Sequence, residues 1–358
     1  MALSDKKDYI CAVPFFSLEM HMQKRLLCCD SWLHKKLPSK VSPRDAWLSP
    51  EADEIRESVL DGSFRHCDHE HCPVLHQLVD IGPKGRIHPL YPKNKLPKDV
   101  EKAIQDYREG KHTPKTIQFA FDQSCNLACP SCRPFMIMYN SKQIAKVKED
   151  ILLLEEQYGE TTEVLYITPS GDPFISVAYR DFLRTFDPRK WPALKNIHLH
   201  TNATYWTKKM WESMPNVHPY VTTCEISLDA ATKDTYENKT RLNGNWDELM
   251  ENLDYIYTIP KLQQVKLSFV MQQKNYTEIN QFYHLMISKF KEKASIYYGK
   301  IMDWGGDTFT PEQYKEAAIW MPDHPEHDAF VKEFQRTLPA GQAWTNAQEF
   351  LKEPTKLL

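Results

Sequence analysis

The spacing of apolar and polar side chains predicts strands and helices in alternation through the middle of the chain. Apolar residues alternate with polar ones in short runs typical of strands, and they recur every three or four residues in longer runs typical of amphipathic helices. Strands are expected at 116–121, 164–168, 196–201, 221–229, 264–272 and 295–298. Helices are expected between them, at about 144–158, 175–186, 207–213, 246–257 and 276–290. Such alternation implies parallel strands joined by right-handed crossovers, so the sequence predicts an α/β fold.

The two flanks of this central region differ from it. Residues 9–33 are expected to form a hairpin with cysteine at each end, followed by a helix that starts at Ser49 or Pro50 and ends before Gly62. A stretch rich in proline and lysine then surrounds one helix candidate at 97–109, which is typical of a linker. Further helices are expected at 311–320, 325–338 and 345–351. We therefore divide the chain into a cysteine-rich domain 1–85, a linker 86–115, a central domain 116–304 and a helical C-terminal extension 305–358.

Composition and charge narrow the function classes. The 358 residues are 41% hydrophobic and 26% charged, with a formal net charge of −3. These values are ordinary for a globular protein and give no general attraction to nucleic acid or to an anionic membrane. No stretch approaches the ~18 apolar residues of a membrane span, so a cytoplasmic location is expected. The nine cysteines are an odd number, and without a secretory signal they favour metal or redox chemistry over a disulfide framework.

Three cysteines follow the first central strand at C-x3-C-x2-C spacing, namely Cys125, Cys129 and Cys132. Loops at the carboxyl ends of parallel strands are where α/β folds place their active sites. Four thiolates would close a zinc site or saturate an iron–sulfur cluster, whereas three leave one coordination position open for a ligand. The alternative is a structural zinc site in which His198, His200 or a more distant side chain is the fourth ligand.

A second group of cysteines lies in the N-terminal third. Five cysteines within about 60 residues indicate a soft-metal site in a chain that is not secreted. The favoured ligands are Cys11, Cys28, Cys67 and Cys72. Cys29 is the alternative to Cys28, because consecutive side chains of a strand face opposite sides. Zinc is the competing metal, since His66, His69 and His71 lie beside the last two cysteines.

The loop 121–134 around the first three cysteines resembles the signature of radical SAM enzymes. The resemblance implies that Cys125, Cys129 and Cys132 hold three irons of a [4Fe-4S] cluster and that the fourth iron binds S-adenosylmethionine (SAM). It implies an enzyme that cleaves SAM reductively to a 5′-deoxyadenosyl radical, which takes hydrogen from a substrate. The electrons would come from a flavodoxin- or ferredoxin-type reductant. The implied fold is a partial (β/α)6 TIM-like barrel, which agrees with the strands expected above.

Later strand ends carry the same resemblance. Ser170-Gly171-Asp172-Pro173 is similar to the family's G-G-E-P, which holds the SAM amino group, and Thr201-Asn202-Ala203 is similar to its T-N-G near the ribose. The SAM-binding residues that the resemblance implies are Ser170, Gly171, Asp172, Pro173, Asn202, Ser227, Asp229, Arg241 and Met271. The residue before the third cysteine is commonly an aromatic that flanks the adenine, but here it is Ser131. Adenine binding must then rely on other groups.

No catalytic residue is assigned, and the candidates are His198, His200 and Cys224. The two histidines share one strand face with Asn202, because side chains repeat with period two. They are either acid–base or substrate groups, or core histidines with satisfied hydrogen bonds. Cys224 shares the opposite face with Ile226 and Leu228, toward the helices. We expect it to be a buried structural thiol, with a hydrogen-atom donor as the alternative.

The N-terminal domain resembles the SPASM module of radical SAM maturases, with a C-x2-P-F start, C-C-x-x-W, and an I-R-x-S-x-L-x-G helix ending at Gly62. The module implies an auxiliary [4Fe-4S] cluster on the second cysteine group. It usually follows the barrel, whereas here it precedes it. Relatives with this module modify peptides or proteins, and other radical SAM enzymes act on sugars or nucleosides, so the substrate stays open. The competing functions are a non-catalytic zinc-binding interaction or nucleic-acid module and an electron-transfer iron–sulfur protein.

Overall fold

The computed structural model describes residues 7–28, 33–69, 72, 75, 90–168, 170–303, 308–338 and 342–351. The chain divides into two compact units. The first unit comprises Met1–Asp122, Asn140–Ser170 and Phe186–Ile197. The second unit comprises Gln123–Tyr139, Gly171–Thr185 and His198–Leu358. Among the described residues, no helix has both the length and the apolar character needed to cross a bilayer.

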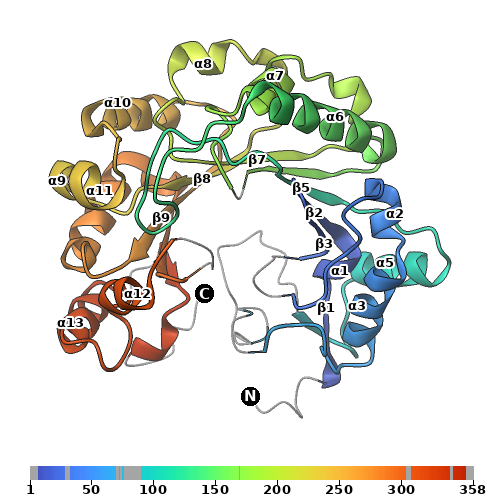
Figure 1. Ribbon diagram of the computed structural model, residues 1–358, viewed down its shortest axis with the longest axis horizontal. Helices are drawn as coiled ribbons and strands as arrows, with labels where there is room; N and C mark the ends of the chain where they lie inside the picture. Colours follow the sequence, from blue (N-terminus) through green and yellow to red (C-terminus); the bar gives the residue numbers. More distant parts are fainter. Residues whose placement is uncertain are drawn as a thin grey trace. The chain divides into compact units, whose positions relative to one another are not determined.

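Nine of the eleven strands in the described part of the chain form a large, mostly parallel sheet (Figure 1). Over the first unit its order is β3 (Arg25–Leu26), β2 (Ser17–His21), β5 (Thr116–Ala120) and β6 (Val164–Ile167). Over the second unit its order is β7 (Asn196–Thr201), β8 (Thr223–Ser227), β9 (Gln264–Met271), β10 (Ala294–Lys300) and β11 (Ala343–Thr345). The pairs from β7 to β11 are all parallel, so their carboxyl ends lie along one edge of the sheet.

Helices separate the strands along the chain. Those of the first unit are α1 (Val13–Phe16), α2 (Pro43–Trp47), α3 (Pro50–Leu60), α5 (Lys98–Arg108) and α6 (Ser141–Tyr158). Those of the second unit are α7 (Val177–Arg184), α8 (Lys208–Glu212), α9 (Lys233–Thr235), α10 (Trp246–Tyr257), α11 (Ile279–Phe290), α12 (Pro311–Ala317) and α13 (His327–Thr337). The two units also contain short 3-10 or π helices, namely η3 (Pro188–Lys190), η4 (Pro215–Val217), η5 (Tyr236–Thr240), η6 (Tyr276–Glu278), η7 (Lys291–Lys293) and η8 (Gln348–Phe350). The predicted α/β class is confirmed, and the order of elements is consistent with the expected partial barrel.

Local sequence explains where the helices begin and which face they bury. Asn140 and Gln143 form a reciprocal capping box at the start of α6, and the Ser49 hydroxyl accepts the Ala52 N–H at the start of α3. In the second unit, α11 packs on β9 and β10 and on α10, as Figure 1 shows. Its buried positions, Ile279, Phe282, Met286 and Phe290, recur at the expected helical spacing.

Two expectations for the chain ends were wrong. β1 (Tyr9–Cys11) pairs antiparallel with β4 (Leu90–Pro92), and the hairpin is formed only by β2 and β3. Cys11 therefore lies outside the hairpin. The expected helix at 345–351 is instead the end of β11 followed by η8, because residues 343–345 pair with the edge of β10 and Trp344 packs 4.3 Å from the Tyr297 ring.

Candidate functional site

The three cysteines of the C-x3-C-x2-C loop lie in the second unit on a closed turn. Cys125 N–H donates to the Ile137 carbonyl (2.8 Å), which ties the two ends of the loop together. The backbone N–H groups of Cys132 and Arg133 both donate to the Cys129 carbonyl at 2.9 Å. Cys125 and Cys129 are buried, whereas Cys132 is exposed. The loop thus has two shielded thiols and one that faces outward.

Each of the three sulfurs accepts an N–H hydrogen bond from a different residue. Asn202 Nδ2 lies 3.5 Å from Cys125 Sγ, and Arg241 Nη1 lies 3.5 Å from Cys129 Sγ. Arg133 Nε lies 3.4 Å from Cys132 Sγ. Burial raises the pKa of the Cys125 thiol to about 11, and it also raises the pKa of Cys129, where the Arg241 guanidinium opposes the rise. As they stand, no three His, Cys, Asp or Glu side chains of the described residues converge closely enough to hold a metal ion.

Asp172 fastens the turn after β6 to the end of β7. Its Oδ2 accepts the Thr201 hydroxyl (2.7 Å) and the Asn202 N–H (2.8 Å), and its Oδ1 accepts the Phe174 N–H (2.9 Å). The carboxylate is buried, and Oδ2 already accepts two hydrogen bonds. Gly171 precedes it with φ of +78°, a conformation in which glycine has no Cβ strain, and the buried Pro173 follows it.

The end of β7 is linked to the cysteine loop by side-chain amides. Asn202 Nδ2 donates to Asn126 Oδ1 at 3.0 Å, and Asn126 Nδ2 donates to the Thr204 hydroxyl at 3.0 Å. Ala203 has φ of +62°, in the left-handed region. Asn252 holds this turn by donating to the carbonyls of Ala203 and Thr204. The loop and the strand end therefore form one hydrogen-bonded framework.

Asp229 and Arg241 form a buried ion pair beside Cys129. Arg241 Nη2 lies 2.7 Å from Asp229 Oδ2, and the Val270 N–H donates to Asp229 Oδ1 at 2.7 Å. Asp229 has φ of +58°, and the Asn275 side chain holds its carbonyl at 2.9 Å. Burial raises the pKa of the Asp229 carboxyl, and the Arg241 guanidinium opposes that rise. This left-handed turn explains why β8 ends at Ser227 rather than at residue 229 as expected.

The candidate catalytic side chains of β7 and β8 are hydrogen-bonded between strands. His198 Nδ1 lies 2.8 Å from Thr223 Oγ1, and His200 Nε2 lies 2.9 Å from Ser227 Oγ. Both histidines are half-buried. The predicted burial of Cys224 is confirmed, and this burial raises the pKa of its thiol. Met271, at the end of β9, is fully buried.

The remaining predicted site residues lie in the first unit. Ser170 donates its hydroxyl to the Ala120 carbonyl (3.3 Å) and so belongs to the turn after β6. Cys11, Cys67 and Cys72 lie near one another in the hydrophobic cluster that contains Phe15 and Val59. Burial raises the pKa of Cys11, and negative charge on Cys72 and Cys67 raises it further. Cys28 is half-buried, and Cys29 and His71 lie outside the described residues.

Sequence reasoning did not single out several residues of this site. Asn126 and Arg133 stand directly beside Cys125 and Cys132, and that adjacency was the available signal. Gln272 directly follows Met271, but its place in a cavity shared with Phe309 depends on packing between distant segments. No local pattern could have indicated that cavity.

Comparisons with known proteins give structural likenesses only. No family model matches the chain, and no curated protein matches it. The fold is similar to the crystal structure of Streptococcus suis SuiB, with 14% identity, a TM-score of 0.44, and coverage of 70% of this chain and 56% of that one. It is also similar to SuiB bound to S-adenosylmethionine, with 12% identity, a TM-score of 0.40, and coverage of 73% of this chain and 55% of that one. A third similar structure is anSMEcpe with bound AdoMet, with 13% identity, a TM-score of 0.39, and coverage of 65% of this chain and 63% of that one. In each case the chain spans less than two thirds of the other protein's length, and at these identities the likeness concerns the fold.

Proposed function

We propose that the chain is a radical SAM enzyme whose SAM-binding cluster lies in the second unit. Cys125, Cys129 and Cys132 would hold the [4Fe-4S] cluster that binds SAM. The observation that carries the proposal is that each of their sulfurs accepts an N–H from a different residue. When bound, the cluster would supply the electron that cleaves SAM to a 5′-deoxyadenosyl radical able to take hydrogen from a substrate.

The donor set fits such a cluster better than zinc. Thiolates are the ligands of iron–sulfur clusters, and hydrogen bonds to the sulfurs together with burial set their reduction potential. Arg133 and Arg241 would place positive charge beside the negatively charged thiolates and cluster. The two histidines that could complete a zinc site, His198 and His200, are hydrogen-bonded to Thr223 and Ser227. A three-cysteine loop that no fourth ligand joins among the described residues favours a metal centre with an open position.

The chain's own residues would bind and orient SAM at the strand ends. Asp172 would provide a buried carboxylate for an ammonium group, and Ser170, Gly171 and Pro173 belong to the same turn. Asn202, Ser227 and Asp229 provide polar groups at the ends of β7 and β8, while Met271 provides apolar surface. Arg241 would hold both Asp229 and Cys129 in place. Burial of these groups would exclude water from the reacting atoms.

The second cysteine group would hold an auxiliary [4Fe-4S] cluster in the first unit. The packing of Cys11, Cys67 and Cys72 at one hydrophobic cluster supports this ligand set, with Cys28 or Cys29 as the fourth member. A flavodoxin- or ferredoxin-type protein would supply electrons. The substrate we favour is a peptide or protein, as for relatives that share the SPASM-like module, with a sugar or nucleoside as the other class.

The proposal is tested by anaerobic reconstitution followed by incubation with SAM and dithionite. We expect brown protein with about eight iron and eight sulfide per chain, as two [4Fe-4S] clusters require, and formation of 5′-deoxyadenosine. Replacing Cys125, Cys129 and Cys132 by Ala should abolish 5′-deoxyadenosine and remove half of the iron. The buried Cys224 provides the matched control, since Cys224→Ala should keep both. Colourless protein with about two zinc ions would instead support the zinc-binding module.

A further inference from the structure

The π helix η5 begins with a buried tyrosine whose hydroxyl lacks a partner. Tyr236 is fully buried, and its hydroxyl oxygen has no hydrogen-bond partner among the described residues. Most buried polar side-chain atoms of folded proteins do have a partner, because an unmade hydrogen bond in the interior is costly. The hydroxyl therefore indicates a group that binds beside it.

The ring of Tyr236 is fixed by its neighbours. A Cβ atom on Gly244 would collide with Tyr236 Cε1, so only glycine lets the backbone lie this close to the ring. The Trp246 ring also packs against it, with ring centroids 5.5 Å apart. The Tyr236 carbonyl accepts the Arg241 N–H at 2.8 Å, which closes the turn between the two residues. Because ring and backbone are both held, the hydroxyl is committed to one place.

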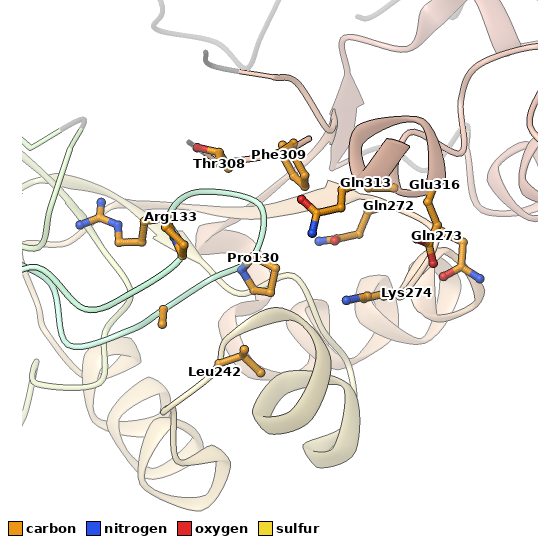
Figure 2. A pocket seen from close by; sticks show the side chains of 13 residues that line it. Pro130, Arg133, Leu242, Gln272, Gln273, Lys274, Thr308, Phe309, Gln313 and Glu316 are labelled. Atoms are coloured by element: carbon orange, nitrogen blue, oxygen red, sulfur yellow. The ribbon is translucent and has the colours of Figure 1, made fainter. Parts of the chain in front are cut away.

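This turn is joined to the cysteine loop. The Leu242 carbonyl accepts the Ala128 N–H at 3.1 Å, and Arg241 Nη1 lies 3.5 Å from Cys129 Sγ. Leu242 and Pro130 line one cavity of about 320 Å³, and Figure 2 shows Leu242 of the turn below Pro130 of the loop. The turn that carries the tyrosine thus contacts the loop at Cys129 and beside it.

The charges of the site act on the Tyr236 hydroxyl. Burial raises its pKa; the Arg241 guanidinium opposes this rise, and negative charge on Cys129 adds to it. Asp229 and Asp172 also raise the pKa, but less than Cys129 does. The hydroxyl therefore keeps its proton at neutral pH and lies within electrostatic range of the Cys129 thiolate. It is a hydrogen-bond donor beside an anionic centre.

An inorganic sulfide of an iron–sulfur cluster is an acceptor that fits this donor. The Tyr236 hydroxyl makes no hydrogen bond to Cys129 Sγ, which accepts an N–H from Arg241. A cluster held by Cys129 presents sulfides as well as thiolates, and hydrogen bonds to these sulfurs help to set its reduction potential. A donor stabilises the more negative, reduced form of the cluster and so raises that potential.

We propose that the Tyr236 hydroxyl donates a hydrogen bond to a sulfide of the [4Fe-4S] cluster on Cys125, Cys129 and Cys132, and that this bond raises the reduction potential of the cluster. The inference rests on the function proposed above. The bond favours the one-electron step from [4Fe-4S]²⁺ to [4Fe-4S]⁺, for which dithionite or a protein reductant supplies the electron. Tyr236 is then a residue that tunes the cluster and does not contact the substrate.

A redox titration of the anaerobic protein with dithionite, followed by electron paramagnetic resonance without SAM, tests the proposal. The background is a variant with Cys11, Cys67 and Cys72 replaced by Ala, so that one proposed cluster is titrated. Tyr236→Phe should make the equilibrium constant for one-electron reduction about tenfold smaller, which is a midpoint potential about 60 mV more negative. The matched control Tyr158→Phe removes another buried hydroxyl without a partner among the described residues, in α6 of the first unit, and should leave the potential unchanged.

Thermal unfolding of the cluster-free protein separates this role from a structural one. In that state the Tyr236 hydroxyl has no hydrogen bond to lose, so Tyr236→Phe should keep or raise the melting temperature. Tyr298→Phe should lower it, because the equally buried Tyr298 hydroxyl donates to the Ile279 carbonyl at 2.8 Å. A loss in Tyr236→Phe as large as in Tyr298→Phe would overturn the proposal, since the hydroxyl would then have a partner within the protein.

An unchanged potential in Tyr236→Phe would also overturn the proposal. If that variant keeps the potential but binds SAM more weakly, the hydroxyl acts on SAM and its assignment to the cluster is wrong. If the single-cluster background holds no iron, the proposed function fails and the hydrogen bond fails with it. If the wild type holds the cluster and cleaves SAM while Tyr236→Phe has the same potential, only the assignment of Tyr236 fails.

Discussion

Replacing Arg241 by methionine should destabilise the protein by leaving Asp229 charged and unpaired in the interior. Arg241 is 9% exposed and Asp229 is 1% exposed, and Arg241 Nη2 lies 2.7 Å from Asp229 Oδ2. Arg241 also donates to Cys129 Sγ, so methionine removes two contacts of one guanidinium. Methionine has a similar length and fills the space with apolar atoms.

The expected loss in the free energy of unfolding is about 3 kcal/mol, because breaking one side of a buried ion pair costs ~3–5 kcal/mol and the Val270 N–H still binds Asp229 Oδ1. That is a large share of the ~5–15 kcal/mol that stabilises a typical domain. Adding Asp229→Asn should restore about 2 kcal/mol, because asparagine removes the stranded charge, keeps the Val270 bond and tolerates φ of +58°.

Urea unfolding of the reduced, cluster-free protein at pH 7, followed by tryptophan fluorescence, gives these free energies by linear extrapolation. The control is Arg336→Met, which removes an exposed arginine–glutamate pair at the same 2.7 Å distance and should cost below ~0.5 kcal/mol. The reasoning is refuted if Arg241→Met costs no more than that control, or if the double variant is no more stable than Arg241→Met.

Three further outcomes are expected. Burial lowers the pKa of His112 to about 4, so the folded state disfavours protonation of this side chain. The free energy of unfolding is therefore highest above the pKa of histidine in the unfolded chain, near 6.5, and falls by ~1–2 kcal/mol as the pH drops toward 4. Urea unfolding at both pH values should show that His112→Leu removes this part of the acid sensitivity. Ala203→Gly should raise the melting temperature and Ala203→Val should lower it, since Ala203 has φ of +62° and glycine relieves roughly 0.5–1 kcal/mol of strain. Asn202→Ala removes the N–H donor to Cys125 Sγ and a hydrogen bond to Asn126. The reconstituted variant should therefore lose iron to a chelator several times faster than the control Asn238→Ala, whose asparagine is exposed. Equal rates of iron loss would contradict this role of Asn202.

Local patterns were sufficient to predict much of the central fold. Period-two alternation along β8 predicted that Cys224 is buried, and the structure agrees. The cysteine loop and the strand ends that resemble SAM-binding motifs were found from residue order alone. The second unit brings the Asp172 turn, Asn202 and the cysteine loop together through hydrogen bonds.

Features that depend on distant segments were not predictable. β1 pairs with β4, some eighty residues away in sequence, and nothing in either segment specifies its partner. Residues 343–345 become a strand because the edge of β10 is available, which overrides their weak helical pattern. The left-handed turn at Asp229 is enforced by Arg241, Val270 and Asn275, so its effect on the length of β8 appears only after folding.

The measurement that tests the central claim most directly is electron paramagnetic resonance of the dithionite-reduced protein with and without SAM. A variant with Cys11, Cys67 and Cys72 replaced by Ala retains only the proposed active-site cluster. The account predicts a [4Fe-4S]⁺ signal whose g values shift when SAM is added, because the ligand binds an iron that the protein leaves open. A spectrum unchanged by SAM, or no cluster signal in this variant, would contradict it.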